Sequence, residues 1–187
     1  MPASLPIDAL LPGLTEFLHA GVSCVIDAPP GSGKTTRVPL ALMDAPWLGG
    51  RKILMLEPRR LAARSAARHM AGLLREKTGG RIGYRTRLDT RVSKETRVEV
   101  VTEGVLTRML LHDPELSGYG CVIFDEFHER GLHGDLGLTL CLDVRPLRPD
   151  MRLIVMSATL DMPLVRRLLG DCPMFSCPGY PCPVETK

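Results

Sequence analysis

The chain has 187 residues, which is enough for one domain with a substantial core that needs no disulfides. Hydrophobic residues make up 44% and charged residues 24% of it, as in ordinary globular proteins, and a net charge of +3 does not by itself indicate a polyanionic partner. The sequence shows neither a signal peptide nor an apolar run of membrane-spanning length, so we expect a cytoplasmic protein with no membrane partner.

The first half of the chain predicts alternating helices and strands. Apolar residues at helical spacing predict a helix over 6–20, and the apolar segment Ser23–Asp27 predicts a strand directly after it. A Gly-rich turn then leads into a helix over Thr35–Met43. The continuous apolar run Lys52–Glu57 is typical of a strand that is buried on both faces of a parallel sheet.

The same alternation continues to residue 170. Further helices are expected over Leu61–Lys77, Glu103–Leu111, Leu136–Val144 and Met162–Leu169. Further strands are expected over Arg81–Arg87, Arg97–Thr102, Cys121–Phe124 and Arg152–Met156. This order predicts an α/β fold with a mainly parallel sheet and helices on both faces. The Pro- and Cys-rich tail after Gly170 resembles a linker or interdomain strand more than a core element.

The six cysteines suit a reducing compartment. Three of them lie inside apolar runs and are expected to be core residues: Cys24, Cys121 and Cys141. The other three are regularly spaced in the tail: Cys172, Cys177 and Cys182. Their spacing matches no standard zinc pattern and prolines interrupt it, so we assign no metal site there.

The segment Ala28-Pro-Pro-Gly-Ser-Gly-Lys-Thr35 resembles a phosphate-binding loop between a strand and a helix. Its glycines allow a tight turn whose backbone N–H groups point at phosphate oxygens, and the helix that follows adds its positive N-terminal dipole. Lys34 would contact the β- and γ-phosphates of ATP, and the Thr35 hydroxyl would ligate Mg²⁺. The expected nucleotide-binding residues are Pro30, Gly31, Ser32, Gly33, Lys34, Thr35 and Thr36. The alternative is a chance Gly-Lys-Thr in an ordinary turn, which the placement between a buried strand and a helix argues against.

An acidic pair follows another predicted strand. Asp125 would hold Mg²⁺ together with Thr35, and Glu126 would complete the metal shell and orient or deprotonate the attacking water. Acidic pairs are also common at helix N-termini, but the phosphate loop in the same sheet favours the catalytic interpretation. For His128, the residues leave open either a surface cap or a polar link to Ser157-Ala-Thr159.

Two groups of arginines are close together in the sequence. The first contains Arg59, Arg60, Arg64 and Arg68, and the second contains Arg81, Arg85, Arg87 and Arg91. Either group could contact phosphates of a nucleic acid or lie on solvated helix and loop faces, and composition does not decide between the two.

Together these motifs resemble the first RecA-like domain of a superfamily 2 helicase of the DEAH branch. Asp125-Glu-Phe-His128 stands where that family has Asp-Glu-Ala-His. With Leu56-Glu-Pro-Arg-Arg-Leu-Ala-Ala-Arg64 and Asp113-Pro-Glu-Leu-Ser-Gly118, the chain is similar to the bacterial HrpB group of this branch. The resemblance extends from about Leu5 to Glu185 and implies an ATP-hydrolysing P-loop domain over 1–178, with catalytic roles for Lys34, Asp125, Glu126 and His128.

The resemblance also implies residue roles that spacing alone does not indicate. The residues expected to contact RNA or another single-stranded nucleic acid are Pro58, Arg59, Arg60, Thr102, Glu103, Gly104 and Arg108. The residues expected to couple hydrolysis to strand movement are His128, Ser157, Ala158 and Thr159. In relatives a cationic residue on the helix after Pro58 stacks on a base, and either Arg68 or His69 could take that place here.

One part of the family pattern is absent. Such helicases close two RecA-like domains over ATP, and the second supplies arginine fingers from a QxxGRxGR-type motif, which does not occur in this sequence. Residues 179–187 resemble the start of the linker to that domain, so we expect a fragment with weak activity of its own. Two rival functions stay open: an ATPase that acts on protein, and a non-catalytic nucleotide- or RNA-binding module.

Overall fold

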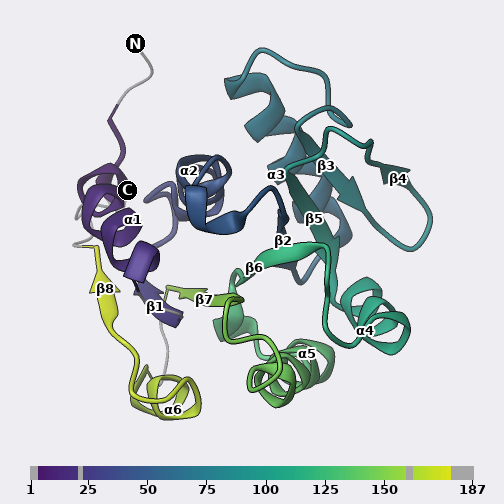
Figure 1. Ribbon diagram of the computed structural model, residues 1–187. Helices are drawn as coiled ribbons and strands as arrows, with labels where there is room; N and C mark the ends of the chain where they lie inside the picture. The colour runs from purple at the N-terminus through teal and green to yellow at the C-terminus, as the bar shows by residue number, and fades with distance from the viewer. Residues whose placement is uncertain (1–3, 21–22, 159–161, 178–187) are drawn as a thin grey trace, which may run out of the picture.

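The computed structural model describes residues 4–20, 23–158 and 162–177 (Figure 1). Within these ranges it contains one eight-stranded sheet in the order β4-β3-β5-β2-β6-β7-β1-β8. The strands are β1 (Ser23–Asp27), β2 (Lys52–Glu57), β3 (Ile82–Arg85), β4 (Thr90–Arg91), β5 (Val98–Thr102), β6 (Tyr119–Phe124), β7 (Arg152–Ser157) and β8 (Met174–Ser176). All neighbours are parallel except the antiparallel pair β3 and β4.

Helices cover both faces of the sheet, as the alternation of elements predicted (Figure 1). The α-helices are α1 (Leu11–Ala20), α2 (Lys34–Leu42), α3 (Arg60–Leu73), α4 (Glu103–His112), α5 (Leu132–Val144) and α6 (Met162–Leu168). Short 3₁₀ helices are η1 (Pro6–Ala9), η2 (Pro46–Leu48) and η3 (Phe127–Glu129). Helices α1, α2 and α3 lie on one face and α4, α5 and α6 on the other (Figure 1). None of the helices in the described part of the chain is both long and apolar enough to cross a bilayer.

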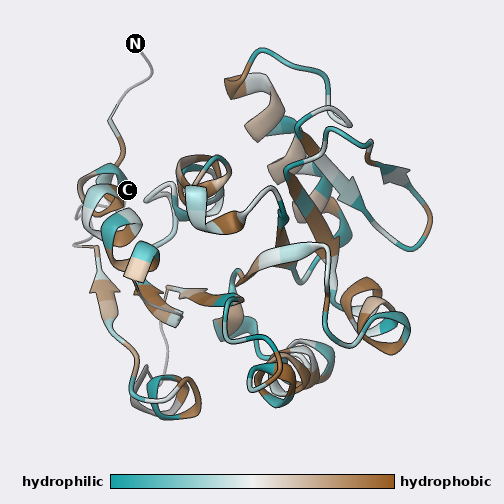
Figure 2. Ribbon diagram, in the orientation of Figure 1, coloured by the Kyte–Doolittle hydropathy of each residue, from teal (hydrophilic) through white to brown (hydrophobic). Residues whose placement is uncertain are grey.

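Two hydrophobic cores sandwich the sheet, and strand β2 shows how its sequence serves both. Ile53 and Met55 pack in the core under α1, α2 and α3, whereas Leu54 and Leu56 pack in the core under α4, α5 and α6. Side chains alternate between the two faces of a strand, so a strand covered on both sides is apolar throughout. The helices combine hydrophobic and hydrophilic residues, as expected for elements with one buried face (Figure 2).

Two expectations from the sequence are wrong at the ends of the chain. The single helix expected over 6–20 is divided into η1 and α1. The Asp8 carboxylate accepts the Leu5 N–H (2.9 Å) at the start of η1, and the Ile7 N–H donates to the Ser32 carbonyl of the phosphate loop (3.1 Å). The tail was expected to be a linker or an interdomain strand, but Met174–Ser176 pairs with β1 as the edge strand of the domain's own sheet. There the ring of Phe175 packs against Phe17, with 5.7 Å between the ring centroids.

The cysteines of the chain are core residues where the structure describes them. Cys24, Cys121 and Cys141 are fully buried, as predicted. Cys172 packs in the core under α4, α5 and α6, while Cys177 packs in the core on the opposite face of the sheet. These two thiols therefore cannot share a metal ion, and Cys182 lies outside the described residues.

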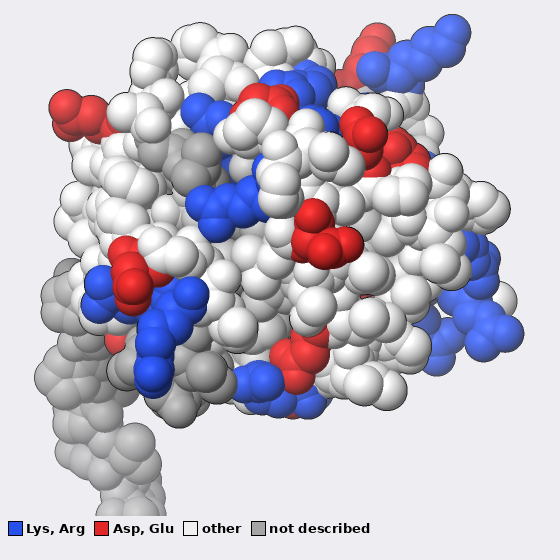
Figure 3. Space-filling view, turned by 60° about the horizontal axis from the view of Figure 1, so that its bottom comes forward, with Lys and Arg blue, Asp and Glu red and all other residues white. Residues whose placement is uncertain are grey.

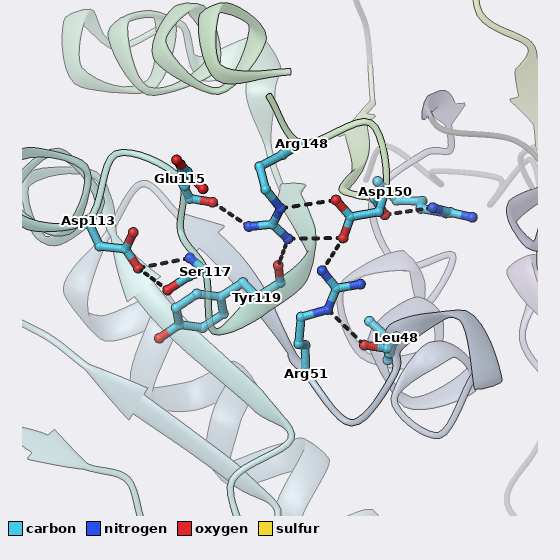
Figure 4. A network of polar contacts seen from close by, with 9 residues as sticks. Leu48, Arg51, Asp113, Glu115, Ser117, Tyr119, Arg148 and Asp150 are labelled. Carbon is cyan, nitrogen blue, oxygen red and sulfur yellow. Dashed lines mark hydrogen bonds and ion pairs between the residues drawn. The ribbon is translucent and has the colours of Figure 1, made fainter. Parts of the chain in front are cut away.

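A polar network joins the amino ends of β2, β6 and β7 (Figure 4). The guanidinium of Arg148, which is 8% exposed, donates to the carbonyl oxygens of Glu115 (2.6 Å) and Tyr119 (3.0 Å) and to the Asp150 carboxylate (3.0 Å). Asp150 also accepts from Arg51, and the two guanidinium groups hold the pKa of its carboxyl well below its usual range. The network fixes the ends of three central strands that lie far apart in sequence.

Replacing Arg148 by methionine is expected to lower the free energy of unfolding by about 2–4 kcal/mol, because two carbonyls lose their donor in a buried place. Urea unfolding at neutral pH measures this change. The matched control is Arg68→Met, because Arg68 is exposed on α3 and its replacement should lower the free energy of unfolding much less. Equal losses in the two variants would show that the network contributes nothing beyond side-chain length.

Candidate nucleotide site and nucleic-acid interface

The phosphate loop takes a backbone conformation that only glycine adopts easily. Gly31 and Gly33 have φ angles of +77° and +93°, and a Cβ on Gly33 would lie 2.6 Å from the Leu5 side chain. Helix α2 begins at Lys34, so its N-terminus faces the concave side of the loop. The Ser32 hydroxyl is buried without a hydrogen-bond partner among the described residues. A nucleotide phosphate fits this site because it would supply the missing partner to Ser32 and accept from the loop N–H groups.

The acidic pair lies directly against this loop. The Asp125 N–H donates to the Leu56 carbonyl at the end of β2 (3.0 Å), which fixes the backbone where β6 ends. The Thr35 hydroxyl donates to Asp125 Oδ2 (2.5 Å), and Lys34 Nζ lies 2.9 Å from Glu126 Oε1. Residues 90 positions apart thus meet at the carboxyl ends of the strands, where ligands of parallel sheets bind.

A third carboxyl group, which the sequence did not single out, lies beside the pair. Glu57 ends β2 and is only 2% exposed, and burial together with the nearby Asp125 raises its pKa to about 9. Burial also raises the pKa of Asp125. The surplus of carboxyl oxygens over nearby cations, together with the Thr35 hydroxyl, is the donor set that Mg²⁺ prefers. The only sequence signal for Glu57 is an acidic residue at the end of an otherwise apolar buried run.

Glu57→Gln is expected to stabilise the protein at pH 8 in metal-free buffer, by about 1–2 kcal/mol. The folded-state pKa of Glu57 lies above its unfolded value, so the folded form binds the extra proton and stability falls as pH rises from about 4.5 toward 9. Glutamine removes this dependence, and the difference between the proteins should vanish near pH 4. Thermal unfolding across this pH range tests it, and a gain that is independent of pH would contradict it.

The residues predicted to couple hydrolysis to movement lie beside Glu126. His128 Nδ1 is 3.3 Å from Glu126 Oε2, and the Ala158 N–H is directed at the same nitrogen at 3.5 Å. The carbonyl of Ser157, a buried residue at the end of β7, accepts the Ala28 N–H at the start of the phosphate loop (2.9 Å). The imidazole therefore lies between the acidic pair and the segment after β7, where Nδ1 can accept the Ala158 N–H or, when protonated, donate to Glu126. This position fits the polar link rather than a surface cap. Thr159 lies outside the described residues.

Most of the predicted nucleic-acid residues line one cavity of about 440 Å³, which shares Pro58 and Glu103 with the space beside Asp125 and Glu126. Its lining includes Pro58, Arg60, Thr102, Glu103, Gly104 and Arg108. Arg59 is the exception, because it is exposed and pairs with Glu129 at 3.1 Å. The cavity is also lined by Arg87 and His133, whose place the sequence did not predict. Arg87 was one of eight clustered arginines, and proximity in sequence did not distinguish it from the others.

The two arginine groups prove to be mixed in character. Four members form ion pairs within the domain: Arg59 with Glu129, Arg64 with Asp89, Arg81 with Glu76 and Arg85 with Glu99. By contrast, Arg60 and Arg87 line the cavity. Arg68 and His69 are both exposed on α3, so the structure does not select between them. Figure 3 shows one face of the molecule, on which several basic side chains lie beside acidic ones.

Comparison with known proteins gives consistent matches. A family model described as DEAD/DEAH box helicase matches residues 13–168. The chain is 50% identical to the ATP-dependent RNA helicase HrpB of Escherichia coli (strain K12) over 186 residues, covering 99% of this chain and 23% of that protein. It is 36% identical to the DExH-box ATP-dependent RNA helicase DExH3 of Arabidopsis thaliana, covering 99% of this chain and 16% of that protein.

Solved structures agree with these matches. The crystal structure of the Escherichia coli DEAH/RHA helicase HrpB superimposes with a TM-score of 0.91 at 51% identity, over 97% of this chain and 23% of that one. The chain thus spans about a quarter of the length of these relatives or less. The family match over most of the chain, the shared α/β RecA-like fold and the close sequence identity show that the chain belongs to the DEAD/DEAH box helicase family.

Proposed function

We propose that this chain is the ATP- and Mg²⁺-binding half of a DEAH-type helicase motor that hydrolyses ATP to ADP and phosphate while moving on RNA. The observation that supports this most strongly is the meeting of two motifs, with Thr35 2.5 Å from Asp125 and Lys34 2.9 Å from Glu126. A cavity lined by Arg60 and Arg108 lies next to them. A nucleotide site alone would fit many ATPases, whereas the neighbouring basic cavity favours a motor on a polyanion.

Each residue of the nucleotide site has a separate task in this proposal. The N–H groups of residues 31–36 and the Lys34 ammonium would hold the phosphates, while Thr35, Asp125 and Glu126 would hold Mg²⁺. When bound there, Mg²⁺ would supply positive charge against the charge that develops on the phosphate oxygens. Lys34 pairs with Glu126 in the structure, so its move to the phosphates would release Glu126 to accept a proton from the attacking water.

The other half of the active site is proposed to lie in a second RecA-like domain of the same longer protein. The relatives are at least four times as long as the part that this chain matches, and the present sequence has no arginine-finger motif. We propose that the RecA-like domain covers residues 1–178 and that 179–187 begin the linker. The buried free thiols Cys24, Cys121 and Cys141 are consistent with a protein of the cytoplasm.

RNA is the proposed track because the relatives carry the name RNA helicase, and the contacts proposed here involve the strand backbone rather than base edges. Charge reversal at Arg60 or Arg108 is expected to weaken binding of single-stranded RNA on the order of tenfold and to lower its salt dependence. Fluorescence anisotropy at several salt concentrations measures both effects.

The matched control for this experiment is Lys94→Glu, which makes the same charge change on an exposed loop. An RNA affinity that falls equally in all three variants would reflect net charge alone. Unchanged affinity in the Arg60 and Arg108 variants would instead favour the rival ATPase that acts on protein.

A further inference from the structure

Glu103 lies between the nucleic-acid cavity and the acidic pair. It lines the cavity of about 440 Å³ together with Arg60 and Arg108. It also lines a narrow space on its other side, bounded by Asp125 and Glu126. Pro58 is the other predicted nucleic-acid residue that borders both spaces. Glu103, the first residue of α4, and Pro58, which follows β2, therefore form the wall between the two sites.

The Glu103 carboxylate occupies a socket formed by two glycines at the start of α5. A Cβ on Gly131 would lie 2.7 Å from Oε1 and 2.8 Å from Oε2, and a Cβ on Gly134 would lie 2.8 Å from Oε1. Any side chain at either position would displace the carboxylate. The positive end of the α5 dipole also favours a negative charge there. Glu103 is thus held by α5 from one side while its neighbours, Thr102 and Gly104, face the cavity from the other.

The segment that joins this socket to Glu126 is strained. Glu126 and Arg130 stand on either side of η3 with φ angles of +48° and +43°, which non-glycine residues rarely adopt. Arg130 is fixed to the first turn of α5 by three hydrogen bonds that its guanidinium donates to the Asp135 carboxylate (2.9, 3.1 and 3.3 Å). A strained turn keeps its shape only while its surroundings hold it, so a shift of the first turn of α5 would be passed on to Glu126 and His128.

We propose that Glu103 is a positioning residue that transmits occupancy of the nucleic-acid cavity to Glu126 through the first turn of α5. When the backbone of residues 102–104 binds a phosphate of the nucleic acid, the Glu103 carboxylate moves. The two glycines that form its socket, Gly131 and Gly134, move with it. A carboxylate repels phosphate, so Glu103 itself is poorly suited to hold the strand. This role rests on the proposed function, since it requires that nucleic acid stimulates ATP hydrolysis.

The experiment compares two variants of the longer protein that carries this domain. Glu103→Ala removes the carboxylate, and Gly134→Ala keeps it but fills its socket with a methyl group. In both we expect the maximal RNA-stimulated turnover of ATP to fall about tenfold. In Gly134→Ala, turnover without RNA and the Kd for RNA should change less than about twofold, since Gly134 is neither a nucleotide-site residue nor part of the cavity lining.

Two controls match these changes outside the proposed route. Gly72→Ala adds the same methyl group to α3, where nothing lies within 4 Å, and Glu95→Ala removes an exposed carboxylate. Both should keep full stimulation. Thermal unfolding of all four variants separates a loss of the fold from a loss of stimulation.

Three results would overturn the role of Glu103. The first is RNA stimulation of ATP turnover that survives in either test variant. The second is a loss of stimulation that weaker RNA binding explains. The third is an equal fall of ATP turnover with and without RNA. If the unsubstituted protein itself shows no stimulation by RNA, the proposed function fails, and the role of Glu103 fails with it. The unsubstituted protein thus distinguishes the two failures.

Discussion

Replacing Glu126 by glutamine is expected to lower ATP turnover by the longer protein at least about a hundredfold, because glutamine cannot accept the proton of the attacking water. The Kd for Mg-ATP should stay within about threefold, since the groups that hold the phosphates remain. In the structure Glu126 pairs with Lys34 at 2.9 Å, and its loss frees the ammonium for the phosphates. Steady-state hydrolysis and calorimetric titration measure the two quantities separately.

Glu95→Gln is the matched control, because it makes the same change at an exposed position away from the site. It should leave both turnover and affinity unaltered. Unchanged turnover in the Glu126 variant would refute the enzymatic role of this residue and favour the non-catalytic binding module.

Replacing Lys34 by alanine is expected to weaken the binding of Mg-ATP on the order of a hundredfold. Lys34 is the first residue of α2, and its side chain is 3% exposed, so the ammonium is held in a buried place with Glu126 as its partner. A bound phosphate would take the place of Glu126 beside this desolvated cation, where charge-assisted contacts are strong. Calorimetric titration with Mg-ADP avoids turnover during the measurement.

Lys94→Ala removes the same ammonium from an exposed loop and should bind as the unsubstituted protein does. Comparable Kd values for the Lys34 variant and this control would contradict the assignment of the phosphate site.

The sequence predicted the strands best where a strand is buried on both faces, because such a strand is a continuous apolar run. The bounds of β1 and β2 are those expected, because every residue of such a strand is constrained by a core. The edge strand Met174–Ser176 was missed because its pairing depends on β1, which is about 150 residues away. The helix expected over 6–20 was divided for a similar reason, since the Ile7 N–H donates to the Ser32 carbonyl in the phosphate loop (3.1 Å).

Only part of the candidate site could be predicted from the sequence. The phosphate loop and the acidic pair are contiguous motifs, so their positions could be inferred before their contacts were known. The raised pKa of Glu57 and the direction of the Glu103 carboxylate both depend on packing between elements that are far apart in sequence. No local sequence pattern carries such information. Arg87 and His133 could not be predicted for the same reason, because only the folded chain brings them to the cavity beside Arg60.

A chain that holds one half of an ATPase site should hydrolyse ATP slowly without the other half. The measurement is the rate of ATP hydrolysis by the 187-residue chain with saturating single-stranded RNA, compared with the rate of the longer protein under the same conditions. Without arginine fingers we expect the chain to turn over at least about a thousandfold more slowly. Turnover by the chain alone at the rate of the longer protein would show instead that these 187 residues hold a whole active site.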